Sequence, residues 1–479
     1  MPRTKRSSIE TEKALTAHSD GLSLADEVTS PVSIETSVEV AKAKRKSKSV
    51  AKEDGKTEAK PKSRSKTEAK AKSSKSTEAR QNSQTVGQEA PQSTLVASET
   101  ASAPPGTRSN QSSEHYASVL QNWREQIQEA VANKNKIRIV GGESKTWFAP
   151  YVDAADGQQE HADRSISLLR TTDYAGVIEY EPSELYIQAR SGTSLREIKR
   201  LLAQHGQILA FEPPLFGDSA TVGGMLACGL SGPRRAYSAA MKDHVLGVSL
   251  INGRAEMLRF GTKVIKNVAG YDVSRLMVGS FGSLGVITDI TLKVIPAPQS
   301  ECSLVFAVSE PDAMRLLQRW AGQCLPISAS CYYAGRLTLR LSGLASVVDD
   351  AHQKLGGIRL DQDHAFWESL GEQQHHFFHA EPELNLWRLS LPSTAPAPDF
   401  RYKSLLEWGG ALRWMWTLES PETVRSYAQE NRGHATLFRV ANGLAPSRSS
   451  INVVQAKIQE RIRAVFDPEG IFDLGQWRS

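Results

Sequence analysis

The sequence predicts an α+β protein preceded by a disordered N-terminal tail. The first 115 of the 479 residues contain no Phe, Trp or Tyr, and a stretch of that composition cannot bury enough apolar surface to fold. From about Ala297, short strands and helices alternate over about 145 residues, which is typical of an antiparallel sheet with helices on one face. Glycine-rich runs lie between these two parts, and the length allows two or three domains.

The tail is strongly basic. Residues 41–80 hold 15 Lys or Arg and 5 Asp or Glu, a local net charge of +10, whereas the whole chain is only +5. Such a tail can bind nucleic acid or an anionic membrane surface, or act as a solubilising extension. Nucleic-acid binding is the least favoured of these, because the tail has no aromatic residue for base stacking.

The chain shows no targeting or membrane-spanning signal. The N-terminus lacks a hydrophobic segment and is acidic from Glu10 onward, unlike a signal or transit peptide. No run approaches the ~20 apolar residues of a membrane span. We therefore expect a cytoplasmic protein without a transmembrane segment, and leave open a peripheral association with the inner face of the membrane.

Four cysteines, at 228, 302, 324 and 331, have no C-x-x-C spacing. This spacing argues against an iron–sulfur cluster or zinc ribbon within the chain, and against a disulfide framework. We expect four reduced thiols.

The folded part begins with a predicted amphipathic helix. Apolar residues recur at three- and four-residue steps over 115–133, and a short strand follows at 137–140. Next comes the sequence Gly141-Gly142-Glu143-Ser144-Lys145. The two glycines can open backbone amides, and Ser144 and Lys145 can add a hydroxyl and a positive charge.

The next elements are strands at 177–181 and 185–190 and a helix at 195–206. Ser194 and Glu197 have the spacing of a capping box, and Gly206 is a stop signal. Pro213-Pro214 then predicts a rigid extended turn. Further on, Asn252-Gly253 between two apolar runs predicts a β-hairpin of 245–251 with 254–260.

Two glycine-rich runs dominate the centre of the chain. They are 219–232 (SATVGGMLACGLSG) and 279–288 (GSFGSLGVIT), and the second continues into a strand. Such loops suit a phosphate or a flat ring, because backbone amides can approach a ligand where no Cβ intervenes. Neither run is a phosphate-loop or dinucleotide-turn motif. The alternative is that the glycines only form tight turns at sheet edges.

The order and spacing of several short pieces resemble a known family. Thr221-Val-Gly223-Gly224, Ser231-Gly232, Asp243 to Gly247 and the 279–287 run are similar to the PCMH-type FAD-binding domain of vanillyl-alcohol-oxidase flavoproteins. Within that family the chain most resembles the FAD-binding, E-type subunits of bacterial glycolate oxidases. The resemblance covers residues from about Ile137 to the C-terminus.

This resemblance implies the domain organisation. A tail (1–114) is followed by a PCMH-type FAD-binding domain of two α+β subdomains (115–296), by an α+β cap domain with an antiparallel sheet (297–445), and by a return to the FAD domain (446–479). The cap would cover the substrate side of the flavin.

The resemblance also implies the FAD-binding residues. The 141–145 turn would wrap the pyrophosphate, Pro213 and the Lys266-Asn267 loop would lie near the flavin ring, and Val286-Ile287 would cradle the adenine. The expected set is Gly141, Gly142, Ser144, Lys145, Pro213, Thr221, Gly223, Gly224, Ala227, Ser231, Gly232, Lys266, Asn267, Gly285, Val286 and Ile287.

The sequence departs from the family pattern in the 141–145 turn. The family commonly has arginine at the position of Val140 and glycine at that of Glu143, so Glu143 must point away from the phosphates or the turn must be looser. Many relatives attach the flavin through a histidine in this turn. None is present here, so we expect non-covalent FAD.

Oxidation of a 2-hydroxy acid needs a base for the hydroxyl proton and a cation for the carboxylate. The Glu-His-Gly-x-Gly segment that supplies such groups in catalytic relatives is absent. The candidates are Arg388, His434 and Arg439 in the cap. Each arginine lies on an apolar strand and needs an anionic partner, either a structural carboxylate or a ligand. A structural role as a hydrogen-bonded histidine of the core explains His434 equally well.

A histidine cluster, Gln374-His375-His376-Phe-Phe-His379, has helical spacing that suits a metal. A solvated helix face explains it better, and no metal site is predicted.

The sequence thus predicts an FAD-dependent oxidoreductase subunit of the glycolate oxidase kind. It would work beside a second FAD-containing catalytic subunit and an iron–sulfur subunit, on glycolate or D-lactate. Two rivals remain: a stand-alone FAD-linked 2-hydroxy-acid dehydrogenase, and a structural partner whose flavin site has decayed.

Overall fold

The computed structural model describes residues 107–148, 165–262, 271–379, 381, 383–441, 453–472 and 474. Most of the predicted tail and the loop with Lys266 and Asn267 lie outside the described residues. The first helix, α1 (Thr107–Asn133), begins at Thr107 rather than at residue 115 as predicted. No helix in these ranges is long and apolar enough to cross a bilayer.

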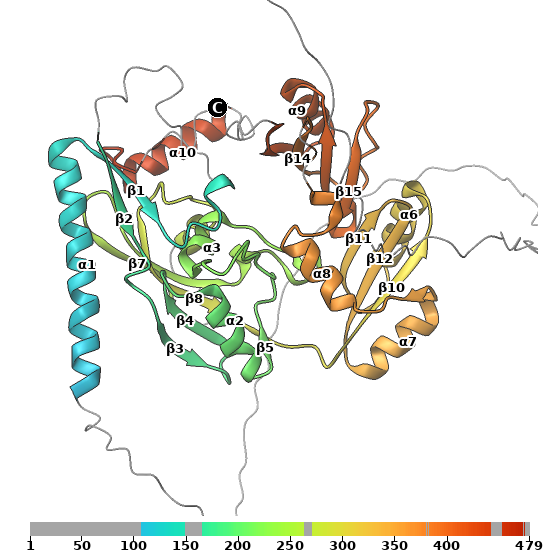
Figure 1. Ribbon diagram of the computed structural model, residues 1–479, viewed down its shortest axis with the longest axis horizontal. Helices are drawn as coiled ribbons and strands as arrows, with labels where there is room; N and C mark the ends of the chain where they lie inside the picture. Colours follow the sequence, from blue (N-terminus) through green and yellow to red (C-terminus); the bar gives the residue numbers. More distant parts are fainter. Residues whose placement is uncertain are drawn as a thin grey trace, which may run out of the picture. The chain divides into compact units, whose positions relative to one another are not determined.

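The part of the chain predicted as an FAD-binding domain is built on a five-stranded antiparallel sheet (Figure 1). Helices α2 (Leu195–Gln204) and α3 (Val222–Cys228) bury apolar side chains against one face of this sheet. In spatial order the strands are β3 (Val177–Glu181), β4 (Tyr186–Arg190), β8 (Val286–Lys293), β6 (Val245–Ile251) and β7 (Met257–Gly261). Ser194 caps α2 by accepting from the Glu197 amide, as its spacing predicts.

A parallel pair of strands carries the 141–145 turn. β1 (Lys136–Val140) pairs with β2 (Ile166–Arg170), and both contribute to a core that α1 shares. The C-terminal segment joins this core after α10 (Val453–Phe466), because Ile471 and Phe472 are buried there and Ile137 N donates to Ile471 O (2.8 Å). The start of β1 is thus held from both sides.

Short elements complete this half. They are β5 (Gln207–Ile208) paired with β9 (Ile295–Pro296), α4 (Arg235–Ser238), α5 (Val273–Leu276), and the 3-10 turns η1 (Thr146–Phe148) and η3 (Met241–Asp243).

The predicted hairpin forms, but its turn is longer than predicted. Ile251 pairs with Met257, so five residues form the loop rather than the Asn252-Gly253 dipeptide alone. The Asn252 side-chain oxygen accepts from the amides of Arg254 and Glu256 (2.9 Å each), and Gly253 N donates to Phe466 O (2.8 Å). The Asn252 side chain and the contact with Phe466 together select the wider loop.

The cap is one eight-stranded antiparallel sheet, as the fold class predicts. In spatial order its strands are β13 (Ile358–Arg359), β10 (Ser300–Ala307), β12 (Arg336–Gly343), β11 (Ile327–Tyr333), β15 (Lys403–Glu407), β16 (Leu412–Thr417), β14 (Asn385–Ser390) and β17 (His434–Arg439). The sequence analysis did not predict β11, whose sequence is ISASCYY: Ile, Ala and Cys alternate with serine there, but most of these apolar residues are small, so the alternation is a weak strand signal.

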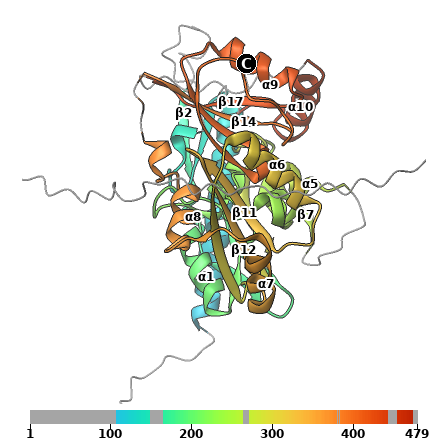
Figure 2. The ribbon, with the colours of Figure 1, turned by 90° about the vertical axis from the view of Figure 1, so that its right-hand side faces the viewer.

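Helices lie on both faces of this sheet, not on one as predicted. α6 (Glu310–Ala321) and α7 (Ala345–Leu355) share one core with β10 and β12, and α9 (Pro421–Glu430) packs beside β17 (Figure 2). α8 (Asp363–Gly371) instead buries Trp367 and Leu370 in a separate aromatic core with Trp408, Trp414 and Phe438. The other 3-10 turns are η4 (His376–Phe378) and η5 (Trp408–Gly410).

Candidate functional site

The turn after β1 presents unused backbone donors. Within the described part of the chain, the amides of residues 142–145 have no hydrogen-bond acceptor. Glu143 has φ of +54°, a left-handed conformation that turns consecutive amides toward one side, as in anion-binding nests. We call residues 142–145 the amide turn.

The glycine-rich run 219–232 does not offer free backbone amides to a ligand at Gly223 and Gly224, as was predicted for it. It is not an open loop: Thr221 caps the helix α3, which ends at Gly229 with φ of +68°. Gly223 N donates to Ser191 O (2.7 Å) and Gly224 N to Thr221 Oγ1 (3.1 Å), so both amides are satisfied internally. Glycine is needed at 223 for space, because a Cβ there would lie 2.8 Å from Ser191 Cβ.

A cavity lies where the amide turn, α3 and the second glycine run meet. The space between its walls, counted with the solvent at its open mouth, is about 780 Å³. Ten predicted FAD residues line it: Gly141, Gly142, Ser144, Lys145, Thr221, Gly223, Gly224, Ala227, Gly285 and Ile287. Lining residues that the sequence analysis missed include Thr171, Ser191, Cys228 and Phe281. Cys228 and Phe281 belong to the two glycine-rich runs, whereas Thr171 and Ser191 lie in segments that carry no motif.

Four predicted FAD residues that the structure describes do not line this cavity, and Lys266 and Asn267 lie outside the described residues. Val286 is fully buried in the core shared with α1, because neighbouring strand residues face opposite sides of a sheet. Pro213, Ser231 and Gly232 lie in the segments before and after α3, and Ser231 Oγ accepts from Met241 N (3.3 Å). Among the described residues, the predicted set therefore divides into a cavity group, a group that flanks α3, and Val286 in the core.

Charged side chains at the amide turn are held by protein partners. The Lys145 ammonium donates to Leu215 O (2.8 Å) and Ser144 Oγ (3.2 Å), and burial lowers the pKa of Lys145. The Glu143 carboxylate is half-exposed, 3.9 Å from an Arg170 guanidinium nitrogen. Arg170 thus partly screens an acidic group that stands where the family has glycine.

The two cap arginines differ in their partners. Arg439 donates to two neutral acceptors, Phe378 O (3.0 Å) and Gln373 Oε1 (2.6 Å). Arg388 has neither a hydrogen bond nor a carboxylate within 4 Å in the described residues, so the structural ion pair considered for it is not found there. Its guanidinium lies 5.2 Å from the centre of the Trp408 ring.

Arg388 belongs to a group of ionisable residues that the sequence did not connect. Arg235 stacks on the same Trp408 ring at 4.4 Å. Burial, and then the charge of Arg235, lower the pKa of Arg388 to about 10. Glu407 is buried and accepts from Trp414 Nε1 (2.8 Å), and burial raises its pKa to about 7.

His434 starts β17 opposite Ser390 and keeps solvent contact. It is therefore not a core histidine. Partial burial, and then the charge of Arg388, lower its pKa.

The histidine cluster is not an α-helical face. Only one 3-10 turn forms, because Phe377 and Phe378 are drawn into the cap core. His375 Nδ1 accepts from Phe377 N (3.2 Å), and burial and the neighbouring histidines lower the His375 pKa to about 4. In the ranges that the structure describes, no group of three His, Cys, Asp or Glu is arranged to hold a metal.

Comparison with known proteins decides the family. Residues 121–261 match the family described as an FAD binding domain. Over 353 residues the chain is 40% identical to glycolate oxidase subunit GlcE of Escherichia coli K12, covering 74% of this chain and 95% of that protein. The chain belongs to the GlcE family of glycolate oxidase subunits.

More distant similarities agree with this family. D-lactate dehydrogenase of Anaerostipes hadrus is 32% identical over 176 residues, which cover 36% of this chain and 35% of that enzyme. The solved structure of an alkyldihydroxyacetonephosphate synthase superposes with a TM-score of 0.53 at 14% identity, covering 75% of this chain and 74% of the other. That likeness concerns the fold alone, and the predicted PCMH-type α+β class is confirmed.

FAD is the cofactor that this family's domain binds, and the cavity fits it. The amide turn offers a row of free donors for a diphosphate, and Lys145 adds a positive charge beside it. Gly142 and Gly223 keep the walls at backbone contact distance, where any side chain would intrude. The chain is therefore an FAD-dependent oxidoreductase subunit.

Proposed function

We propose that this chain is the FAD-binding subunit of a glycolate oxidase complex that oxidises glycolate or D-lactate-type 2-hydroxy acids to 2-oxo acids. The observation that carries the proposal is the amide turn, which opens into the cavity of a chain alignable with nearly all of a GlcE subunit. Bound FAD would relay the electrons that leave the substrate within the complex. The residues of this chain would hold that cofactor.

The complex would contain two further subunits. One is a second flavoprotein that carries the catalytic oxidation, and the other an iron–sulfur protein that takes electrons onward. The chain's 28% identity over 137 residues to glycolate oxidase subunit GlcD of Bacillus subtilis supports a second, homologous flavoprotein. The family name, a subunit, supports assembly with other chains.

We infer that the FAD is held without a covalent bond. Among the residues that the structure describes, no histidine lines the cavity, and the sequence of the amide turn contains none. Acid precipitation of the purified protein should therefore release all of the flavin into the supernatant. Flavin retained in the pellet would contradict this inference, and Cys228 would then be the residue to examine.

The cap supplies a candidate site for the substrate carboxylate. Arg235 and Arg388 lie 4.4 and 5.2 Å from the centre of the Trp408 ring, without an ion-pair partner among the described residues. An anion bound by both would offset the repulsion between the two cations. Trp408 itself has φ of +54° and is held by its indole N–H, which donates to Gly232 O (3.1 Å). A strained residue held in this way is typical of a functional site.

His434 is the candidate base in the same region. It is exposed, its pKa is lowered, and its neutral ring can accept a hydroxyl proton at neutral pH. Arg439 is a weaker candidate, because neutral acceptors already occupy its guanidinium. If Arg388 binds the substrate, the flavin of this chain would itself be reduced by it. That result would support the alternative of a stand-alone dehydrogenase.

The test compares the chain alone with the chain co-purified with its partner subunits. We expect bound flavin in both samples, and glycolate-dependent dye reduction in the complex. Arg388→Gln should raise KM for glycolate at least about tenfold, the loss of one charged contact, whereas Arg336→Gln on an exposed cap position should not.

Three outcomes would change the proposal. Full turnover by the isolated chain would favour the stand-alone dehydrogenase. A chain that binds no FAD, alone or in the complex, would favour a structural partner with a decayed site. An unchanged KM in Arg388→Gln would remove Arg388 from substrate binding.

We also propose a cytoplasmic location, with the basic segment 41–80 available for contact with anionic lipid. Deletion of residues 1–106 should abolish salt-sensitive sedimentation with anionic vesicles and leave flavin content unchanged. Equal sedimentation of both proteins would exclude the tail as a tether.

A further inference from the structure

Two loops flank the helix α3, and both contact cap residues. The first, residues 209–219, contains Pro213-Pro214 and is called the proline loop here. The second, residues 230–238, contains Ser231-Gly232 and is called the serine–glycine loop. A Cβ at Gly232 would lie 2.4 Å from Glu212 O, so the loops pack backbone to backbone.

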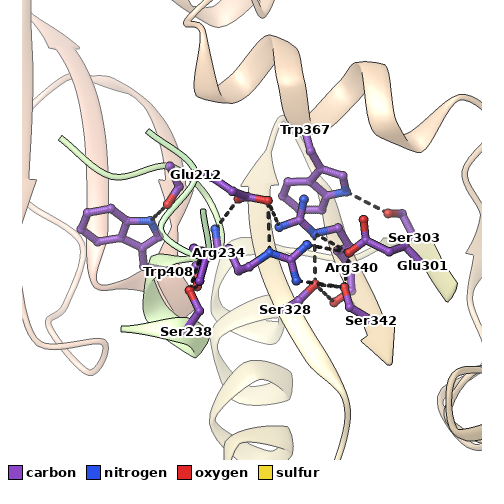
Figure 3. Close-up of polar contacts among 12 residues, drawn as sticks. Glu212, Arg234, Ser238, Glu301, Ser303, Ser328, Arg340, Ser342, Trp367 and Trp408 are labelled. Atoms are coloured by element: carbon purple, nitrogen blue, oxygen red, sulfur yellow. Dashed lines mark hydrogen bonds and ion pairs between the residues drawn. The ribbon is translucent and has the colours of Figure 1, made fainter. Parts of the chain in front are cut away.

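Four charged residues join these loops to the cap sheet (Figure 3). Glu212, from the proline loop, accepts from Arg234 N (2.8 Å), Arg234 Nε (3.2 Å) and Arg340 Nη2 (2.8 Å). Arg234, from the serine–glycine loop, donates to Glu301 on β10 (2.6 Å) and to Ser342 on β12 (3.3 Å). We call Glu212, Arg234, Glu301 and Arg340 the junction network.

The junction network is balanced in charge, and its two arginines are buried whereas its two carboxylates are partly exposed. It contains two guanidinium groups and two carboxylates, and Arg234 and Arg340 are only 7% and 5% exposed. Ser328 Oγ accepts from Arg340 Nε (3.0 Å). Removal of one member would leave an uncompensated charge away from water, which is far costlier than loss of a surface ion pair.

The proline loop continues directly to the FAD cavity. Leu215 O accepts from the Lys145 ammonium that lines it, and the Ser219 carbonyl lies against Gly142 of the amide turn. Glu372, at the end of α8, accepts from Leu215 N (2.9 Å) and Phe216 N (2.7 Å). Cap side chains therefore hold the same loop that supports the phosphate end of the cavity.

Glu212 is also held in an unfavourable backbone conformation. Its φ is +45°, in the left-handed region, where a non-glycine residue costs about 1–2 kcal/mol. Its three hydrogen bonds to Arg234 and Arg340 offset this cost. Without them the residue would relax, and the prolines that follow would carry the movement along the loop.

We propose that the junction network is a positioning device, which lets the cap set the geometry of the two loops beside the bound flavin. Glu212, Arg234, Glu301 and Arg340 act on FAD through the loops and not by contact. The inference rests on the proposed FAD site. It assigns these residues a role in flavin affinity and flavin environment in addition to stability.

The experiment compares two equally buried arginines of the cap sheet in the full-length chain. Arg340→Met breaks the junction network. Arg413→Met is the matched control, because Arg413 is 3% exposed on β16 and donates to Ala395 O, Pro396 O (2.8 Å) and Tyr427 Oη (3.1 Å), with no contact to either loop. Both variants should lower the unfolding temperature.

Only Arg340→Met should change the flavin. We expect about tenfold weaker FAD binding, the loss of one charged contact transmitted to the site, and a shifted visible flavin spectrum. Arg340→Lys keeps the positive charge but loses the paired N–H donors of the guanidinium group. Its FAD affinity should therefore lie between those of Arg340→Met and the unsubstituted chain. If Arg340→Met does not fold, the same measurements of FAD affinity and flavin spectrum are made on Arg340→Lys and Arg413→Lys.

The outcomes separate this inference from the proposed function. Equal effects of the 340 and 413 substitutions on FAD affinity and spectrum would overturn the positioning role, while the FAD site would stand. No flavin binding by the unsubstituted chain would overturn both.

Discussion

Gly142 is the residue at which the FAD site can be tested most directly. A Cβ added there would lie 1.4 Å from Ser219 O and 2.4 Å from Ser219 C. Both are backbone atoms and cannot rotate away. A carbon–oxygen contact needs about 3.3 Å, so in Gly142→Ala the amide turn and the proline loop must separate by about 2 Å.

The size of the effect follows from the amides that move. A hydrogen bond to a charged acceptor contributes about 1.5–3 kcal/mol. Displacement of two amides of the turn should therefore cost about 3–6 kcal/mol of FAD binding, which is roughly 10²- to 10⁴-fold in the dissociation constant. Because Gly142 has an ordinary negative φ, the substitution adds no left-handed strain of its own.

The assay is titration of flavin-free protein with FAD, followed by flavin fluorescence. Gly322→Ala is the control, because the nearest atom to its Cβ would be Arg319 O at 3.9 Å and its φ is −85°. The control should bind FAD like the unsubstituted chain. If Gly142→Ala binds FAD within threefold of the control, the amide turn is not the phosphate site and the reasoning fails.

Three further substitutions test neighbouring features. Glu143→Gly removes a carboxylate whose ion-pair partner among the described residues is Arg170. The variant should bind FAD several-fold more tightly in titrations at low salt, and the increase in affinity should be smaller at high salt. An unchanged affinity at low salt would mean that Arg170 already offsets the charge of the carboxylate. Thr221→Val removes the cap of α3 and should lower the unfolding free energy by about 1 kcal/mol, whereas Thr221→Ser should not, as denaturant unfolding would measure. Glu407→Gln keeps an acceptor for Trp414 but cannot ionise. The pKa of Glu407 is raised from 4.5 to about 7 in the folded state, so ionisation of Glu407 lowers the stability of the unsubstituted chain as pH rises from about 4.5 to 7. The free energy of unfolding of the variant, relative to that of the unsubstituted chain, should therefore increase by about 3 kcal/mol between pH 5 and pH 8. A stability difference that does not change with pH would show that Glu407 ionises normally.

The sequence was sufficient for the elements with strong periodicity. The helix predicted at 195–206 forms as α2 (Leu195–Gln204), because an amphipathic repeat is combined there with the Ser194 cap and the Gly206 stop signal. Strand β11 was missed, because the apolar residues that alternate with its serines are mostly small and give only a weak period-two signal. Local pattern therefore identified amphipathic elements and failed for a strand buried on both faces.

The site was predicted only in part, for a physical reason. Glycine reports that space is restricted, but not whether its amide is free. At Gly142 the amide is free, whereas Gly223 and Gly224 use theirs within the protein. Tertiary contacts with Ser191 and Thr221 make this difference, and no local spacing encodes them.

The partners of the cap residues were even harder to predict from the sequence than the cavity residues. Arg234 and Arg235 are adjacent in sequence but face different partners, the first in the junction network and the second at Trp408. Glu212 and Arg340 are 128 residues apart. A linear pattern cannot reveal pairs of this kind, because they exist only after the cap sheet has formed beside the loops.

The charges around Trp408 couple ligand binding to protonation. Arg388 favours the ionised form of Glu407, and burial favours the neutral form more strongly, which leaves the Glu407 pKa at about 7. An anion bound between Arg235 and Arg388 would offset the positive charge that stabilises ionised Glu407, so the Glu407 pKa must rise. By linkage, the anion then binds more tightly as pH falls through about 7, with uptake of a proton by the protein. His434 would become cationic in the same direction and strengthen the effect, so a carboxylate site here gains affinity on acidification whereas a site for a neutral ligand would not.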